Sequence, residues 1–377
     1  MITVFRYSKV TIIIKLVTII WLLTKLYSYK LWISERIFPV IPVFTLFSDV
    51  KNSIHLSLFA GSLFFLTLIL ILPISKKIIS IFLIFEVASC LLDYSRWQPW
   101  EYQYLLMFMV LAFSANNKQF LKLISILVCF TYIFSGLHKL NGGFLYVIWD
   151  TMILHNLLDI KYLNHNLYMH YMGIAIPIIE IAIGIGLLIV RNKKYFIAAA
   201  IVMHLFIIYL LSPFGINYNE IVIPWNLVML ILVFILFYNT NINFFENIRP
   251  FRRLDFVTIL LVCCLPILNF FNCWDHYLSF NLYSGKVPIL IIQIDEIEKY
   301  PDLKKYISQN KIYKTFKNSS PLSVNKMMLD ELKVPLYCEY RVCAILKNEW
   351  NLKFKGTENR FMIYKYPFKQ DDIYEIK

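Results

Sequence analysis

Charged residues are scarce in this sequence. Asp, Glu, Lys and Arg make up 16% of its 377 residues, whereas hydrophobic residues make up 59%. This balance excludes a soluble globular protein. Several apolar runs instead reach the roughly 20 residues that a helix needs to cross a bilayer. The composition therefore predicts a polytopic helical membrane protein whose main surroundings are the lipid bilayer.

Cysteine pairs of the redox type are missing. The seven cysteines contain no Cys-x-x-Cys motif, which argues against a thiol-redox enzyme. Cys263 and Cys264 lie inside the last apolar run, where packing is the expected role. Cys338 and Cys343 could form a disulfide, but only if their domain faces an oxidising compartment.

Three other functional classes lack their usual signals. The basic residues give a formal net charge of +13, but they lie in short loops and in the tail rather than in one stripe, so no nucleic-acid partner is expected. The two halves of the chain show no matching broken helices with polar sites, which disfavours a transporter. A haem would need ligating histidines in facing spans, and only His204 lies deep in one. No metal ligand is predicted.

The apolar runs predict about nine membrane-spanning helices. The first run carries Lys15 and lacks a small-residue cleavage site, which indicates a retained helix rather than a signal peptide. The Pro-broken stretch 31–48 suits an interfacial or re-entrant segment, and residues 144–158 have the spacing of an amphipathic interfacial helix. The nine expected spans are residues 10–27, 54–73, 78–94, 102–115, 120–137, 172–190, 195–211, 221–238 and 256–272.

Lys and Arg residues gather in alternate loops, and this predicts the orientation. With nine spans all five clusters fall on one side, which the positive-inside rule makes cytoplasmic. We therefore expect an integral protein of a bacterial inner (plasma) membrane, with its N-terminus inside and its C-terminal part outside. The clusters are Arg6 with Lys9, Lys76 with Lys77, Lys118 with Lys122, Arg191 with Lys193 and Lys194, and Arg249 with Arg252 and Arg253.

After residue 273 the composition changes from apolar to mixed and charged. The predicted fold is an all-α polytopic membrane bundle over residues 1–273, followed by a small extracytoplasmic α/β domain over 274–377. A strand is expected at 287–294, a short helix at 323–332 with Ser323 as N-cap, and a hairpin of strands 351–355 and 361–366. The domain lacks a nucleophile motif, a metal constellation and a phosphate loop, and a lid or partner-binding role fits it best.

Four polar residues in or at the ends of spans are the candidate catalytic residues. His138 and Lys139 end the fifth span, where a cationic group costs on the order of 3 kcal/mol. Lys139 could equally be a lysine that snorkels to the interface. Glu180 lies deep in the sixth span and needs a partner, for which Lys139 is one possibility. His204 lies mid-way along the seventh span, and either an interhelical hydrogen bond or a catalytic role would explain it.

Several fragments resemble the HTTM family, the horizontally transferred transmembrane domain related to the membrane domain of vitamin K-dependent γ-glutamyl carboxylases. The resemblance covers about residues 54–238. It rests on Asp93…Trp97-Gln-Pro-Trp-x-Tyr-Gln-Tyr104, Tyr132-x-x-Ser-Gly-Leu-His-Lys-Leu-Asn141, Pro177-x-x-Glu180, His204 and Pro224-Trp-Asn226.

The resemblance implies a carboxylase-like enzyme that uses a reduced quinone to modify glutamate in exported polypeptides. Lys139 matches the lysine regarded as the base in the carboxylases, whereas His138 replaces the lysine before it. The resemblance also implies a cofactor site at Trp97, Gln98 and Trp225. The alternative is a non-catalytic membrane maturation or scaffold protein for a secreted peptide or another partner.

Overall fold

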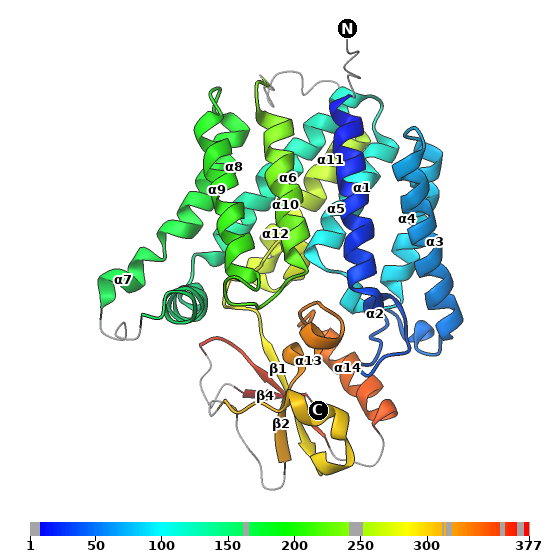
Figure 1. Cartoon of the computed structure of the whole chain (residues 1–377), viewed down its shortest axis with the longest axis vertical. Helices are drawn as coiled ribbons and strands as arrows, with labels where there is room; N and C mark the ends of the chain where they lie inside the picture. The colour runs from blue at the N-terminus through cyan, green and yellow to red at the C-terminus, as the bar shows by residue number, and fades with distance from the viewer. Residues whose placement is uncertain are drawn as a thin grey trace.

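A computed structural model of the protein describes residues 8–160, 166–240, 252–310, 313, 319–354, 359–367 and 373–376. A bundle of long helices occupies the first three quarters of the chain, and a small domain with a sheet lies at one end of it (Figure 1). The long helices are α1 (Lys9–Tyr27), α3 (Asn52–Ile71), α4 (Lys76–Leu91), α5 (Pro99–Phe113), α6 (Asn117–Lys139), α8 (Ala175–Ile189), α9 (Lys194–Leu211) and α10 (Val222–Phe237).

The last apolar run forms a composite helix. It consists of α11 (Arg253–Ile259), the π-helix η5 (Leu260–Cys264), α12 (Leu265–Leu268) and the 3-10 helix η6 (Asn269–Phe271). Pro266 lies near the start of α12 and has no N–H to donate, which fits the change of helix type at this point.

Six stretches of the described chain are long and apolar enough to cross a membrane, and this confirms a polytopic helical membrane protein. Val222–Phe237 is apolar but shorter, and α4 and α5 have only 16 and 15 residues, or about 24 and 22 Å of rise. The count of nine spans therefore stays a prediction. The six are Lys9–Tyr27, Asn52–Ile71, Asn117–Lys139, Leu167–Ile189, Lys194–Leu211 and Arg253–Phe271.

The basic clusters lie at the end of the bundle that faces away from the small domain. Lys9, Lys76, Lys118, Lys194 and Arg253 each stand in the first turn of a helix that begins at that end (Figure 1). The N-terminal end of α1 and the small domain accordingly lie at opposite ends of the molecule. Two residues of the predicted clusters, at positions 6 and 249, lie outside the described residues.

Two glycines let α6 and α8 pack against each other. A Cβ on Gly136 would lie 2.8 Å from the carbonyl oxygen of Pro177, and one on Gly184 would lie 2.6 Å from that of Cys129. Neither backbone oxygen can turn away as a side chain could. Small residues at these positions are therefore required for this close approach, as at many membrane helix interfaces.

The segment after α1 is irregular, and other parts of the protein support its backbone. It contains α2 (Tyr29–Trp32) and the 3-10 helix η1 (Thr45–Phe47), and its apolar side chains Leu31, Phe38 and Ile41 are fully buried. The carbonyl of Ile41 accepts from the N–H of Tyr94 at 2.7 Å. A 3-10 turn, η2 (Tyr94–Arg96), joins α4 to α5 beside it.

The segment between α6 and α8 contains two short helices. The π-helix η3 (Phe144–Leu157) is seen end-on in Figure 1, and α7 (Leu167–Met172) leads into α8. A helix is therefore present where the spacing of residues 144–158 predicts one, although its hydrogen bonds follow the wider π pattern.

A four-stranded antiparallel sheet forms the centre of the small domain, with strand order β2-β1-β3-β4. Its strands are β1 (Ile289–Asp295), β2 (Ser319–Ser323), β3 (Arg360–Tyr364) and β4 (Ile373–Glu375). The helices α13 (Val324–Glu331) and α14 (Tyr340–Lys353) lie between the strands and the bundle (Figure 1). Short 3-10 turns complete it: η7 (Tyr277–Ser279), η8 (Ile297–Lys299) and η9 (Pro301–Tyr306).

The structure confirms two predictions in this domain and corrects a third. The strand at 287–294 and the helix capped by Ser323 are present. The hairpin is wrong, because residues 351–353 end α14, whose buried Cys343, Leu346 and Trp350 follow a helical spacing. The strand after it, β3, pairs with β1 and β4 instead.

Candidate functional site

Lys139 and Glu180 form an ion pair inside the bundle. Lys139 is the last residue of α6, and its Nζ donates to Glu180 Oε2 of α8 at 2.6 Å and to Ser135 Oγ at 2.9 Å. The two charged side chains are only 11% and 6% exposed. A carboxylate at this depth needs a cationic partner, and Lys139 supplies it.

His204 links three helices by hydrogen bonds. Its Nδ1 lies 2.8 Å from Asn226 Oδ1 on α10, and its Nε2 lies 2.6 Å from the hydroxyl of Tyr132 on α6. Because an amide oxygen only accepts, Nδ1 carries the proton, so Nε2 of the neutral ring accepts from Tyr132. This is the arrangement that the interhelical alternative for His204 predicts.

Little free space surrounds these groups. A cavity of about 60 Å³ lies among Tyr132, Lys139, Glu180, His204 and Trp225. That volume corresponds to about two water molecules at roughly 30 Å³ each. It is far too small for a quinone ring system.

His138 points away from this group. In an α-helix consecutive side chains diverge by about 100°. The ring of His138 stacks on Phe270, with centroids 4.4 Å apart, and lines a different cavity. Its Nε2 is buried and has no hydrogen-bond partner among the described residues. The structure therefore brings Lys139, Glu180 and His204 together and leaves His138 apart.

The three residues expected to bind a cofactor are divided between two environments. Gln98 and Trp225 line one cavity of about 570 Å³, whereas Trp97 is half-buried and lines none of the cavities described here. Gln98 donates to the carbonyls of Ser95 and Pro335 at 3.0 and 3.2 Å, which ties the bundle to the small domain.

Trp225 separates this large cavity from the small one around Lys139, because it lines both. Its indole N–H donates to Gln103 Oε1 at 2.5 Å, and Gln103 in turn donates to Thr131 at 3.1 Å. The ring is thus held in place as a wall between the two cavities.

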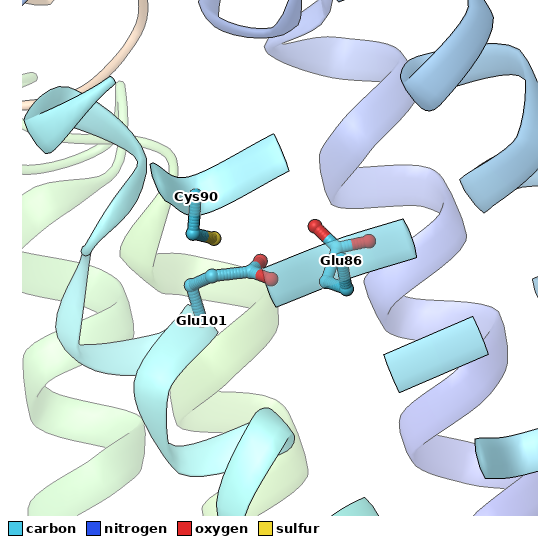
Figure 2. A group of neighbouring side chains, drawn as sticks. All are labelled: Glu86, Cys90 and Glu101. Atoms are coloured by element: carbon cyan, nitrogen blue, oxygen red, sulfur yellow. The ribbon is translucent and has the colours of Figure 1, made fainter. Parts of the chain in front are cut away.

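A second buried cluster escaped the sequence analysis. Glu86 and Cys90 lie one turn apart on α4, and Glu101 faces them from the first turn of α5 (Figure 2). One ligand atom from each lies within 4.8 Å of the other two, and all three side chains are fully buried. Carboxylates and a thiol could in principle hold a zinc-like ion.

Lys25 already supplies a cation to this cluster. Its Nζ lies 2.5 Å from Glu86 Oε1 and 3.0 Å from the centroid of the Trp32 ring. Ser62 donates to the other oxygen of Glu86, so both Glu86 oxygens are engaged. An incoming metal ion would have to displace these donors, so the geometry favours a structural ion pair.

Glu101 is only half satisfied. Its Oε2 accepts from the indole N–H of Trp21 at 2.7 Å, whereas Oε1 has no hydrogen-bond partner among the described residues.

The sequence contains a signal that could have found this cluster. The rule that selected Lys139, an ionisable residue in an apolar run, would also have selected Lys25 and Glu86.

The loop quoted for the HTTM resemblance has structural contacts of its own. Asp93 Oδ2 lies 2.5 Å from the guanidinium of Arg36. Arg96 donates to the carbonyls of Leu31 and Ser89 at 3.0 and 2.8 Å. Burial lowers the pKa of Arg96 to about 10, so it stays charged at neutral pH. These contacts hold the irregular segment after α1 against the end of the bundle.

Ionic contacts also fix the small domain to the bundle. The carboxylate of Glu331 accepts from the backbone N–H groups of Ile37 and Phe38 at 2.5 and 2.8 Å. Arg341 donates from its Nε to the Tyr94 hydroxyl of the bundle at 3.3 Å, and it pairs with Asp275 inside the small domain. Burial together with Asp275 raises the pKa of the Tyr337 hydroxyl, which donates to the same carboxylate. The domain is therefore docked firmly on the segment that it covers.

The two cysteines of this domain are thiols that lie close together. Cys338 Sγ and Cys343 Sγ are 3.6 Å apart, and both residues are buried. The hydrogen bond to Cys343, together with burial, raises the pKa of Cys338. A protonated and buried thiol is a poor nucleophile, so the pair is unreactive in this state.

A protein-family comparison matches residues 117–217, the stretch from the start of α6 to the loop after α9. The matching family is Methylamine utilisation protein MauE. The MauE match includes His138, Lys139, Glu180 and His204 but covers little more than a quarter of the chain. No curated protein and no solved structure matches the chain.

The similarity to MauE corrects the sequence-based assignment. The HTTM family and a carboxylase-like function are wrong, because the helices that carried most of the resemblance match a different membrane family. The fragments behind the resemblance were short, and the contacts of Gly136, Asp93 and Gln98 explain them as helix packing and loop support. The reduced quinone was implied by that resemblance and stays a prediction.

Proposed function

We propose that this chain is a non-catalytic membrane maturation or scaffold protein, which holds a segment of an exported polypeptide between its bundle and its small domain. The printed name of the matching family refers to methylamine utilisation and states no reaction. Similarity over residues 117–217 supports a shared membrane part rather than a shared activity.

The position of the free volume is the observation that carries the proposal. Two cavities, of about 570 and 770 Å³, lie between the bundle and the small domain, and both fall in the size range of ligand sites. The deep polar group around Lys139 has only about 60 Å³. Space for a partner is therefore found at the domain and not at the buried lysine.

The proposed orientation places this site outside the cytoplasm. The basic first turns of α4, α6, α9 and α11 lie at the opposite end of the bundle, where the positive-inside rule favours the cytoplasm. The cavities then face the compartment that receives exported polypeptides.

Variants in the source organism can test this function. The starting measurement is a quantitative comparison of exported polypeptides, and of their resistance to protease, between wild-type and deletion strains. We expect Lys139→Met combined with Glu180→Gln to restore the affected polypeptides, because removing both charges leaves no unpaired ion in the bundle. Val147→Trp should reduce them roughly tenfold, because its larger side chain would project into the 570 Å³ cavity and take space from a bound segment.

Val202→Trp is the matched control, because Val202 is 66% exposed on α9 and lines none of the cavities described here. Immunoblots of membranes check that all variants are present in equal amounts. Loss of the exported polypeptides in the Lys139 and Glu180 double variant, with Val147→Trp unaffected, would overturn the proposal. An unchanged set of exported polypeptides in the deletion strain would overturn it as well.

A further inference from the structure

The larger of the two cavities, with about 770 Å³, is polar and lies under one end of the sheet. The end of α6, the segment after the last apolar helix and the ends of two strands contribute to its walls. Three independent features of these walls indicate the kind of ligand that it takes.

The first feature is a pair of buried polar atoms without partners. His138 Nε2 and Asn281 Oδ1 have no hydrogen bond among the described residues, although these residues are only 5% and 3% exposed. The other end of the Asn281 amide is satisfied, since its Nδ2 donates to Asn269 at 3.0 Å. Leaving a buried polar group unpaired costs about 1–3 kcal/mol, so a polar ligand at this place would stabilise both atoms.

The second feature is an excess of positive charge. Lys286 and Lys365 line the cavity, and neither forms an ion pair with a described residue. Among the described residues of the wall, Glu339 is the one carboxylate, and it is already engaged. Its Oε1 accepts from the backbone N–H of His276 at 2.7 Å and lies 2.6 Å from His276 Nδ1. The cavity therefore favours an anionic ligand.

The third feature is where the lysines stand. Ile289 of β1 pairs with Tyr364 of β3, so Lys286, before β1, and Lys365, after β3, come from the same end of the sheet. The cationic groups thus belong to the small domain, whereas His138 belongs to the bundle. Both lysines stand on the small domain rather than on a membrane-spanning helix, so we expect their ligand to come from the aqueous side. A polypeptide arriving from the aqueous side would meet them directly.

We propose that this cavity binds an acidic segment of a polypeptide, with side-chain carboxylates on Lys286 and Lys365 and a polar donor or acceptor at His138 and Asn281. The inference rests on the proposed function and adds to it the charge of the segment that is held. The rings of Tyr340 and Tyr374, 5.2 Å apart and edge to face, add aromatic surface to the same wall.

Binding of peptide pools to the full-length protein tests the charge preference. The protein is placed in phosphatidylcholine nanodiscs and dialysed against a hexapeptide pool with Glu fixed at two positions and the others mixed. A matched pool carries Gln at the two positions. We expect the Glu pool to be retained roughly tenfold more than the Gln pool, and Lys286→Met with Lys365→Met to abolish the difference.

Lys299→Met with Lys304→Met is the matched control, because it also removes two positive charges from the small domain but lies in exposed ion pairs outside the cavity. His138→Phe should keep the stack on Phe270 and weaken retention of the Glu pool.

Equal retention of the two pools, or equal loss in the control variant, would overturn the inference. Displacement of the Glu pool by phosphatidylglycerol, but not by inorganic phosphate, would reassign the site to a lipid headgroup. The peptide experiment can fail without contradicting the proposed function. If the partner of the scaffold is not acidic, the strain comparison would still give the expected result, whereas the Glu pool would not be preferred.

Discussion

At the scale of single residues, two of the buried ion pairs in the described part of the bundle lie between its long helices, in different halves of it. Lys25 and Glu86 lie in the half formed by α1 to α5, and Lys139 and Glu180 lie between α6 and α8. Removing one member of such a pair leaves the other charge buried and alone. A substitution at one of these positions should therefore lower the free energy of unfolding, whether or not the residue has a role in any activity.

Glu86 and Glu101 should respond differently to the same substitution. Glu86→Gln leaves Lys25 without a counter-charge and should lower the free energy of unfolding by about 3–5 kcal/mol. Glu101→Gln keeps the acceptor for Trp21 and leaves the Lys25–Glu86 pair intact, so its effect should stay within about 1 kcal/mol. Unfolding by SDS titration in mixed micelles measures both values. Equal losses of unfolding free energy in the two variants would contradict the view that Glu86, and not Glu101, is the partner of Lys25.

The sequence allowed some of these contacts to be predicted but not others. An ionisable residue in an apolar run must find a partner, so the need of Glu180 for one, with Lys139 as a candidate, follows from composition. The rotation of α6 about its axis does not follow, because helices that are apolar on nearly all sides leave it undetermined. This is why His138 was grouped with Lys139 although the two side chains face different cavities.

At the scale of elements, the length of an apolar run predicted the helices reliably. Alternation of apolar and polar residues did not predict the strands reliably. The apolar runs correspond to helices even where they are too short to meet the criterion for a span, as in α4 and α5. In the small domain, residues 351–353 alternate like a strand but continue α14, because the packing of Trp350 and Leu346 on one face decides the conformation.

The contact between α6 and α8 provides a test at this scale. Gly136→Ala would place a methyl group 2.8 Å from the carbonyl oxygen of Pro177, so the helices must separate and the Lys139–Glu180 pair must lengthen. We expect a loss of about 1–3 kcal/mol in the free energy of unfolding. Gly61→Ala is the control, because the nearest atoms to its Cβ would be those of the Phe85 side chain, which can move, rather than backbone atoms. A loss in Gly61→Ala as large as that in Gly136→Ala would contradict this account.

At the scale of the whole molecule, the small domain and the bundle form one unit. The carboxylate of Glu331 binds backbone N–H groups almost 300 positions earlier in the chain, and no local pattern in the sequence predicts such a contact. The basic clusters, in contrast, could be placed from the sequence, because positive charge in short loops is a property of each loop by itself. Because the small domain is fixed to the bundle and the basic clusters lie at the opposite end, one measurement of orientation in the membrane decides which compartment the cavities face.

Labelling of single cysteines in intact cells measures it. In a background with the accessible Cys263, Cys264 and Cys273 changed to Ser, the other four cysteines are buried and should not react. Glu298→Cys, at a side chain 79% exposed on the small domain, should react with a membrane-impermeant maleimide in intact cells. Asn192→Cys, in the exposed loop between α8 and α9, should react only after permeabilisation. The reverse pattern would place the cavities on the cytoplasmic side, and an exported polypeptide could then not be their ligand.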